Sequence, residues 1–368
     1  MSPELDLIGR VYDLLVRQSR VPGDAWKIGD ASHGGSEEPG SRWGVVRDMA
    51  RAASDPHTIL LAPEAMTALQ SMAGGAAVPM PGFALHRVRS TFVVGEVVPG
   101  SPAERAGLVP GDAVVSLGGA PVFRGMEDML LLLGRRAGSE LPVEVLRGGV
   151  QRVVRIVLGA ERLPLAGWRL LPGAIGYVRL RFVTASDDPE GDGASLVERA
   201  LDSFEPHAIR GLVLDLRSNP GGYGVGRVAS VLTDRDPIIV YRDAAGRDEI
   251  TRRAPGRARC HCPIVVLVDE QTMSSAEMIT LSLQEHGVAR VVGEPTAGAL
   301  TVPRYVPLGE GFVLMVPDRF AVGPVTRRVL PGLRITPELV VPNRTPEDFA
   351  AGRDPQLEAA LEVLERHG

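Results

Sequence analysis

Residues 263–298 form the stretch that most restricts what this chain can fold into. The run Ile264–Val268 is apolar and β-branched, which is typical of a buried strand. Turn and cap residues follow it, and a helix is predicted from Ser274 to a stop at Gly287. Another strand then leads into the turn at 293–298. This order of strand, turn, helix and strand predicts one unit of an α/β sheet.

Ser274 is a candidate nucleophile because it stands at the start of that helix. Several backbone N–H groups lack intrahelical partners there, and the helix dipole favours negative charge. A serine whose substrate develops an oxyanion is well placed at such a point. Ser274 and Glu277 also satisfy an ordinary capping box. The pattern by itself therefore indicates either a catalytic serine or a helix cap.

Composition limits the classes of protein to which the chain can belong. Its 368 residues, 44% of them hydrophobic and 23% charged, are enough for two or three globular domains. A net charge of -5 without a basic tract argues against nucleic acid as a partner. No apolar run approaches the ~20 residues that span a bilayer. No signal segment is apparent either, so a cytoplasmic location is expected, or a periplasmic or secreted one if a signal has been removed.

Cysteine and lysine are both rare in the chain. Cys260 and Cys262 flank His261, but no second cluster completes four ligands, so no metal is expected. No organic cofactor is expected either. Lys27 is the single lysine among 40 basic residues, which leaves few ways to supply a lysine as a catalytic base.

The chain divides into three predicted parts. Residues 1–78 carry helical patterns, residues 79–160 form a β-rich module with a helix over 126–135, and residues 161–368 alternate strands and helices. The last part ends in a helix over 354–365. Alternation of this kind predicts a largely parallel sheet with helices on its faces. The predicted fold class is therefore α/β with several domains.

The middle part resembles a PDZ domain, through the run GSPAERAGLVPGDAVVSLGGAPV at residues 100–122. Such domains bind an extended peptide by strand addition, and their backbone amides capture a terminal carboxylate. The resemblance implies a carboxylate loop formed by Gly82, Phe83, Ala84 and Leu85. His86 follows this loop and could touch the ligand.

Three turns of the last part are predicted to meet at one edge of its sheet. They are the glycine turn that ends 215–222, the start of the helix at Ser274, and the turn at 293–298. In α/β sheets ligands collect at the carboxyl ends of the strands. Gly221 and Gly222 would let backbone N–H groups point into a site there without a Cβ in the way.

The chain resembles the tail-specific, or C-terminal processing, protease family and the related tricorn protease core. The motifs that carry this resemblance are GLVLDLRSNPGG, TMSSAEM, QEHGVARVVGEPTAG, ITPELVVP and ASDPHTILLAPEA. Together with the PDZ module they cover nearly the whole chain. The resemblance implies a serine peptidase core related to the crotonase and ClpP-like folds, behind a helical N-terminal segment.

The same resemblance implies roles for the residues around Ser274. Ser274 would attack the peptide carbonyl, and Ser275 is the rival nucleophile. The amide of Ser275 and an amide of Gly221 or Gly222 would form the oxyanion hole. Losing one such donor typically costs about 10²–10³ in rate.

At the position of the catalytic base, this chain differs from the best-known branch of the family. Members of the Ser-Lys type carry a lysine at the position of Ala299 and a glutamine at that of Pro303. Resemblance to the tricorn-like branch implies His57 as the base instead, and histidine suits that role near neutral pH. Asp318 and Glu338 are possible orienting acids.

The leading prediction is a serine endopeptidase that captures a protein's C-terminal or extended segment and cleaves it through an acyl-enzyme. Protein or peptide is the expected partner, and a homo-oligomer is possible. One alternative is an inactive peptide-binding or ligand-binding protein on the same scaffold, because GEPTAGAL resembles the repeats of interphotoreceptor retinoid-binding proteins. Another is a protease whose missing acid comes from a partner subunit.

Overall fold

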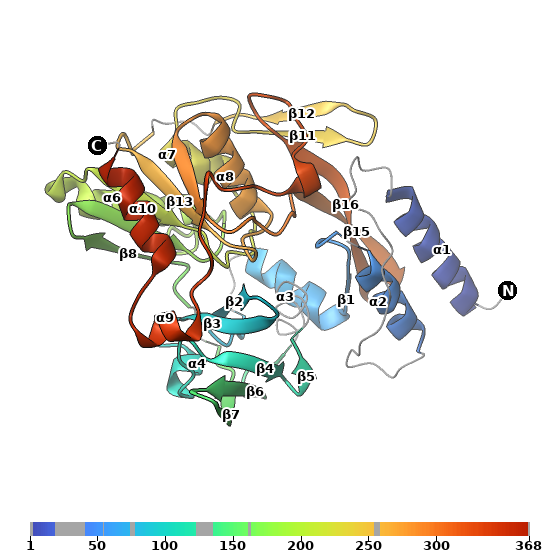
Figure 1. Ribbon diagram of the computed structural model, residues 1–368. Helices are drawn as coiled ribbons and strands as arrows, with labels where there is room; N and C mark the ends of the chain where they lie inside the picture. Colours follow the sequence, from blue (N-terminus) through green and yellow to red (C-terminus); the bar gives the residue numbers. More distant parts are fainter. Residues whose placement is uncertain are drawn as a thin grey trace.

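The computed structural model describes residues 3–18, 41–53, 55–73, 78–122, 135–160, 163–253 and 258–366. Lys27 and nearly all of the helix predicted over 126–135 lie outside these ranges. Three β-sheets organise the described residues, as Figure 1 shows. One is the sheet of the α/β core, one belongs to the PDZ module, and one joins the N-terminal segment to the core.

The core sheet has six strands in the order β17-β14-β13-β10-β9-β8. Their bounds are β8 (Ala166–Leu171), β9 (Ile175–Leu180), β10 (Gly211–Asp215), β13 (Ile264–Val268), β14 (Ala289–Gly293) and β17 (Leu339–Val340). Every neighbouring pair is parallel except β8 with β9. β9, β10 and β13 are buried at every position, as strands covered on both faces should be. The predicted largely parallel sheet is confirmed.

Helices cover both faces of this sheet (Figure 1). On one face lie α6 (Gly193–Phe204), α7 (Val225–Leu232) and α8 (Ser275–Glu285). On the other lies α10 (Pro355–Glu365), which buries Ala360 and Leu364 against β9, β10 and β13. The short α9 (Pro346–Ala350) precedes it. Asp354 caps α10 by accepting a hydrogen bond from Leu357 N at 3.1 Å.

The N-terminal segment joins the core through the sheet β1-β16-β11-β12, with β15 also paired to β16. The strands are β1 (Ile59–Leu61), β11 (Ile239–Asp243), β12 (Asp248–Thr251), β15 (Thr301–Gly309) and β16 (Phe312–Val322). The sequence predicted only β11 among them. β1 runs antiparallel to β16, with Ile59 opposite Met315. This pairing places the residues just before β1 next to the core.

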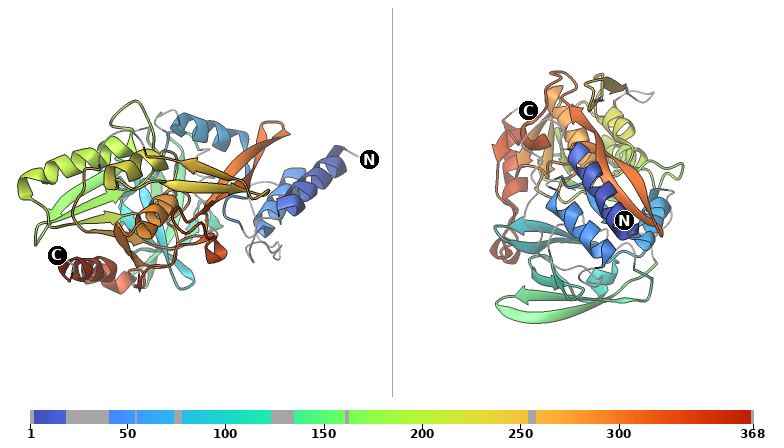
Figure 2. Two further views of the ribbon diagram at one scale, coloured as in Figure 1. Left: turned by 90° about the horizontal axis from the view of Figure 1, so that it is seen from above. Right: turned by 90° about the vertical axis from the view of Figure 1, so that its right-hand side faces the viewer.

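The N-terminal helices pack around that junction. They are α1 (Pro3–Gln18), α2 (Arg42–Ala52) and α3 (Pro63–Ala73). α1 and α2 share a core with Leu314 and Val316 of β16. Both lie at the end of the molecule opposite α6, as Figures 1 and 2 show.

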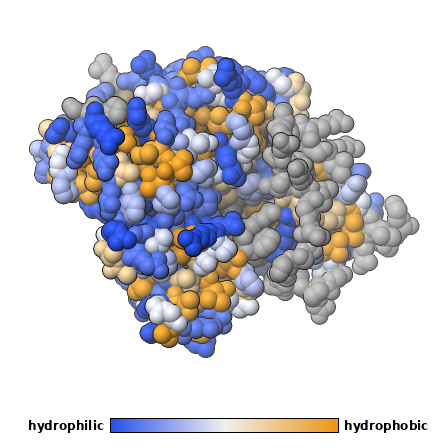
Figure 3. Space-filling model, viewed as in Figure 1, coloured by the Kyte–Doolittle hydropathy of each residue, from blue (hydrophilic) through white to orange (hydrophobic). Residues whose placement is uncertain are grey.

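The PDZ sheet has the order β2-β3-β4-β6-β7, with β5 paired to β4. Its elements are β2 (Phe83–Val88), β3 (Thr91–Val97), α4 (Pro102–Arg105), β4 (Ala113–Leu117), β5 (Ala120–Pro121), β6 (Glu140–Arg147) and β7 (Val150–Val157). Val153 and Val157 of β7 are exposed. Hydrophobic residues lie among hydrophilic ones over the lower part of the molecule in Figure 3, where the PDZ sheet lies in this view. The predicted domain limits after residues 78 and 160 stay predictions.

Candidate active site

Ser274 adopts a backbone conformation that serine rarely takes. Its φ of 52° and ψ of -121° lie outside the helical and extended regions, immediately before α8 begins. Such strain typically costs about 1–3 kcal/mol and persists only where the surroundings hold it. Gly221 supplies part of that support, because a Cβ there would lie 2.7 Å from Ser274 Cβ and 2.9 Å from Ser275 N. The half-buried Ser274 side chain therefore stands on a tightly fitted turn.

Glu277 fixes the same turn from within the core. Its fully buried carboxyl group accepts hydrogen bonds from Ser274 N at 2.9 Å, Ala299 N at 2.8 Å and Gly298 N at 3.0 Å. The Thr296 hydroxyl is a fourth donor. Burial raises the pKa of Glu277 to about 7, although these donors act to lower it. Glu277 thus ties the candidate nucleophile to the segment that follows β14.

Ala299 stands where the resemblance to Ser-Lys peptidases implied a lysine base. Its side chain is completely buried and packs with Ile59 and Leu61 of β1 and with Met273. The surroundings of this position are therefore apolar.

The glycine turn offers one backbone donor to a substrate oxyanion. Gly221 N donates to Asn219 Oδ1 at 2.8 Å, so the suggestion that Gly221 could supply the amide is corrected. Gly222 N has no partner among the residues that the structure describes. Val183 holds Gly222 in place, and a Cβ on Gly222 would lie 2.1 Å from Val183 O. Any side chain at position 222 would therefore clash with the backbone of Val183.

Ser275 contributes a second candidate donor. Its backbone N–H lies in the first turn of α8 and is likewise without a partner in the described ranges. Its hydroxyl donates to Gly222 O at 2.6 Å. The side chain of the rival nucleophile is thus engaged in holding the glycine turn.

His57 lies just before β1 and is only 3% exposed. Its backbone N donates to Asp55 Oδ1 at 2.7 Å, and its ring Nδ1 lies 2.6 Å from Thr301 Oγ1. Burial lowers the pKa of His57 to about 4, so the ring is neutral at pH 7. Among the described residues, no hydrogen bond joins Ser274 to His57 and none reaches Nε2 of the ring.

The two suggested orienting acids do not contact His57, which corrects that expectation. Asp318 lies in β16 and pairs with Arg304 at 3.8 Å and Arg319 at 3.6 Å. Glu338 accepts a hydrogen bond from Val291 N at 2.6 Å. The hydroxyl of Thr301 takes the contact instead, and no sequence motif pointed to it.

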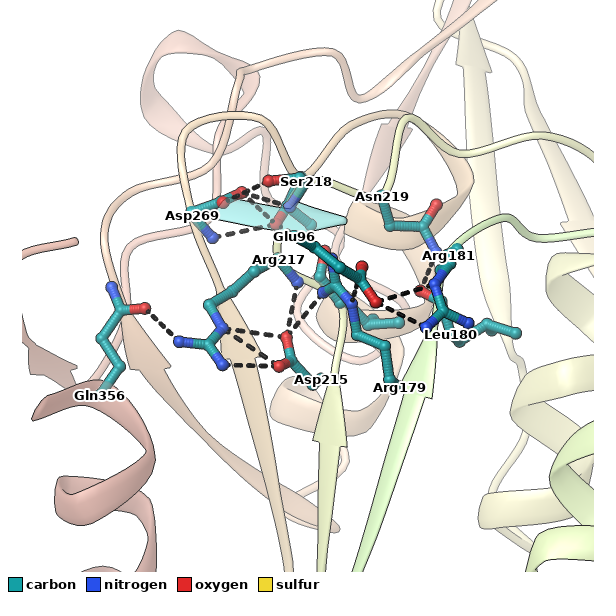
Figure 4. Close-up of polar contacts among 12 residues, drawn as sticks. Glu96, Arg179, Leu180, Arg181, Asp215, Arg217, Ser218, Asn219, Asp269 and Gln356 are labelled. Atoms are coloured by element: carbon teal, nitrogen blue, oxygen red, sulfur yellow. Dashed lines mark hydrogen bonds and ion pairs between the residues drawn. The ribbon is translucent and has the colours of Figure 1, made fainter. Parts of the chain in front are cut away.

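A buried charge network below the glycine turn was not predicted. Asp215 accepts hydrogen bonds from Arg179 and Arg217, as Figure 4 shows. It accepts a further one from the Tyr177 hydroxyl at 2.6 Å. Burial alone would raise the pKa of Asp215, but the two guanidinium groups hold it well below its ordinary value. Arg179 also pairs with Glu96 of β3 at 3.0 Å, so the network joins the PDZ sheet to the core. The sequence signal that could have indicated this network is the pair of opposite charges in Asp215-Leu216-Arg217, at the end of an apolar strand.

The implied carboxylate loop lies at the edge of the PDZ sheet. Gly82 is pressed against Ser101, because a Cβ on Gly82 would lie 2.2 Å from Ser101 Cβ. Phe83, Ala84 and Leu85 begin β2, which is the edge strand. Nearly all of the helix predicted over 126–135 lies outside the described residues.

Core residues contact the same edge strand. Leu85 O lies 2.9 Å from Ser218 Oγ, and Arg87 O accepts a hydrogen bond from Asn343 Nδ2 at 3.0 Å. His86 Nε2 lies 2.8 Å from Arg344 O, so His86 faces the core rather than a peptide ligand. The PDZ sheet is therefore docked on the α/β core through β2.

Comparison with known proteins agrees with this architecture. Residues 174–341 match the model of peptidase family S41, and residues 93–157 match that of a PDZ domain. A carboxyl-terminal-processing protease of Picosynechococcus sp. is 29% identical over 336 residues, covering 87% of this chain and 78% of the relative. The carboxy-terminal processing protease CtpB of Bacillus subtilis is 29% identical over 220 residues, covering 57% of this chain and 44% of the relative.

A solved structure shares the fold. The photosystem II D1 C-terminal processing protease superposes with a TM-score of 0.62 at 23% identity, covering 99% of this chain and 98% of the other. Fold and sequence together define a serine peptidase with a PDZ domain. Residues 174–341 are the part of the chain that is similar to peptidase family S41. Nothing in these comparisons supports the alternative of an inactive binding protein, and the tricorn-like branch stays a prediction.

The residues that the structure describes contain no group of His, Cys, Asp and Glu that could hold a metal ion. Their helices are all too short or too polar to cross a bilayer.

Proposed function

We propose that this chain is a serine endopeptidase of the C-terminal processing type, with Ser274 as nucleophile and His57 as general base. The observation that carries the assignment is the strained Ser274 turn, which Gly221 and Glu277 hold. Beside it lie two backbone N–H groups, those of Gly222 and Ser275, that have no partner in the described part of the chain. Ser274 Oγ attacks the peptide carbonyl, and the N–H groups of Gly222 and Ser275 stabilise the oxyanion. Water then hydrolyses the acyl-enzyme.

His57 accepts the proton of Ser274 through Nε2 in this proposal. The contact of Nδ1 with Thr301 supports a tautomer in which Nδ1–H donates to the hydroxyl and Nε2 keeps its lone pair. Proton transfer requires the gap between Ser274 and His57 to close on substrate, and catalytic hydrogen bonds are often long in a free enzyme. A neutral hydroxyl stabilises an imidazolium less than a carboxylate does, so turnover is expected to be slower than in a triad with an acid.

The PDZ domain is proposed to capture the substrate. The names of the relatives support a substrate segment near a protein's carboxyl terminus. β2 is the edge strand to which such a segment could add. Because Leu85 and Arg87 already contact core side chains, an incoming peptide must displace part of that contact.

The nucleophile is tested with a fluorophosphonate probe and an unfolded protein substrate. Labelling is expected on the peptide that contains Ser274, and Ser274→Ala should abolish both labelling and turnover without lowering thermal stability. Ser275→Ala tests the rival nucleophile: it keeps the backbone N–H, so labelling should persist, at a rate lowered by loss of the hydrogen bond to Gly222 O. Turnover that survives in Ser274→Ala would sink the assignment.

Substrate capture is tested with a pair of peptides that differ only at the C-terminus. The peptide that ends in a free carboxylate should be cleaved with a lower KM than the same peptide that ends in an amide. Equal KM values for the two peptides would contradict capture of a terminal carboxylate, while leaving the assignment of Ser274 intact.

A further inference from the structure

The two cysteines lie side by side outside the catalytic site. Cys260 and Cys262 stand in the loop before β13, and their Sγ atoms are 3.2 Å apart. Both are free thiols. Cys260 is 8% exposed and belongs to the main apolar core, whereas Cys262 is half-buried and within reach of solvent.

The backbone on either side of the pair is fixed. Arg259 N donates to Val231 O at 2.7 Å at the end of α7. Leu212 N of β10 donates to Pro263 O at 2.9 Å. The loop is thus anchored immediately before Cys260 and immediately after Cys262, so the two thiols are held together by the fold.

A disulfide needs only a small movement from this arrangement. The S–S bond measures about 2.04 Å, so the sulfur atoms must approach by about 1.2 Å. Rotation of two short side chains can supply a shift of that size. The pair is therefore preorganised for a bond within the loop rather than for pairing with a distant residue.

The two thiols differ in reactivity. The hydrogen bond from the Cys260 thiol lowers the pKa of Cys262, although burial opposes it. The same bond and burial raise the pKa of Cys260. The thiolate is the nucleophile in thiol–disulfide exchange. The half-buried Cys262 is therefore suited to attack an external disulfide, and the buried Cys260 to resolve the mixed disulfide that results.

We propose that Cys260 and Cys262 form a thiol–disulfide exchange site whose oxidant is a low-molecular-weight disulfide. The Cys262 thiolate attacks one sulfur of that disulfide, which forms a mixed disulfide and releases one thiolate. Cys260 loses its proton to solvent and attacks Cys262 Sγ, which releases the second thiolate. The two protein thiols are oxidised to one disulfide, and the small disulfide is reduced to two thiols.

This site is separate from the peptidase chemistry. The loop lies at the amino end of β13, whereas Ser274 follows the carboxyl end of the same strand. Replacement of either cysteine is therefore expected to leave proteolysis unchanged. The proposal does not depend on the function proposed for Ser274.

The test treats the full chain with oxidised glutathione and measures its intact mass. The wild-type chain should lose two hydrogen atoms and retain no glutathione. Cys260→Ala should stop at a stable adduct with one glutathione, and Cys262→Ser should form an adduct about tenfold more slowly or not at all. Alanine suits the buried site because a free cysteine there behaves as a small apolar residue.

Four outcomes would overturn the proposal. They are an unreactive wild-type chain, a wild-type chain that keeps its glutathione, a disulfide-linked dimer on a non-reducing gel, and rapid adduct formation in Cys262→Ser. Thermal unfolding of each variant, with the wild-type chain as reference, verifies that the variants are folded. A phenylarsine oxide titration gives a second readout, because one arsenic atom should bind the wild-type pair and neither single variant.

Discussion

The two halves of the proposed catalytic pair are held in different ways. Ser274 stands on a turn that the α/β core supports from two sides, through Gly221 and through the buried carboxyl group of Glu277. His57 lies on a short segment before β1, where one side-chain contact, to Thr301, orients its ring. The nucleophile is thus fixed by close packing, whereas the base depends on a contact between residues 244 positions apart. Substitutions around Ser274 and substitutions around His57 should therefore affect activity and stability differently.

Removal of the base should have the largest effect. His57→Ala is expected to lower kcat by about 10³-fold or more, because removal of the general base disables activation of the serine. His286→Ala is the matched control, since His286 Nε2 only contacts Pro237 O at 2.9 Å beyond the end of α8. Steady-state kinetics on an unfolded substrate measures both. An unchanged kcat in His57→Ala would assign the base to another residue.

Gly221→Ala should come next, because it acts on the nucleophile through packing. The added Cβ would meet Ser274 Cβ, Met273 O and Ser275 N at 2.7–2.9 Å, so the turn must shift. A loss of about 10²–10³ in kcat is expected, similar to the loss of an oxyanion donor. Gly173→Ala is the control, because Gly173 also has positive φ but an added Cβ would meet nothing within 4 Å. Equal kcat values in the two variants would show that the contact does not position Ser274.

Glu277→Gln tests the support beneath the nucleophile. Each carboxylate oxygen accepts two hydrogen bonds, and a glutamine amide must turn its NH₂ group toward two donors. We expect destabilisation of about 2 kcal/mol or more, from unpaired buried donors, and a fall in fluorophosphonate labelling rate. Glu285→Gln at the other end of α8 disrupts a similar cluster of donors from Val325 and Thr326. It should lose stability and keep its labelling rate per folded molecule.

Thr301→Val tests the orientation of His57 and should have a smaller effect. Valine keeps the shape of threonine but offers no acceptor to Nδ1, so kcat is expected to fall about tenfold with KM unchanged. Thr301→Ser should restore most of the lost rate. If serine and valine behave alike, the hydroxyl plays no part in orienting the ring.

The pH dependence of stability should distinguish the two regions by sign. The pKa of His57 falls from 6.5 to about 4 on folding, so the unfolded chain binds more protons between these values and acid destabilises the fold. The pKa of Glu277 rises from 4.5 to about 7 on folding, so the folded chain binds more protons between these values. Its contribution to the free energy of unfolding therefore grows as the pH falls from 7 to 4.5. Each effect is about 3 kcal/mol or less, and they oppose one another.

Denaturant unfolding of single variants should separate these contributions. Relative to the wild-type chain, His57→Ala should become more stable on acidification from pH 7 to pH 4.5, and Glu277→Gln less stable. Parallel pH curves for the three proteins would contradict the assigned shifts.

The same contrast explains how much the sequence could reveal. Strands β9 and β13 were predicted with their observed bounds, because short runs rich in apolar residues identify buried strands without reference to the rest of the chain. The Ser274 turn was found in the same way, from residues close in sequence. β15 and β16 were missed because Pro303, Pro307 and Pro317 interrupt their strand pattern.

The partner of His57 could not be predicted from local patterns. Asp318 and Glu338 carry the charge that an orienting acid needs, but the fold directs them to other partners. Thr301 contacts His57 because β1 and β15 both pair with β16. Only the arrangement of that sheet brings the two residues together. The backbone N–H of Gly222 is available because that of Gly221 donates to the Asn219 side chain. The orientation of Asn219 cannot be read from the sequence.

The pairing of β1 with β16 also bears on when the proposed catalytic pair can form during synthesis. His57 leaves the ribosome long before Ser274, but Thr301 and β16, which hold it in place, are translated after the nucleophile. A nascent or prematurely terminated chain that ends before residue 301 can therefore form the Ser274 turn only without an oriented base. With His57 as the proposed base, the oriented catalytic pair therefore cannot form before Thr301 and β16 have been translated.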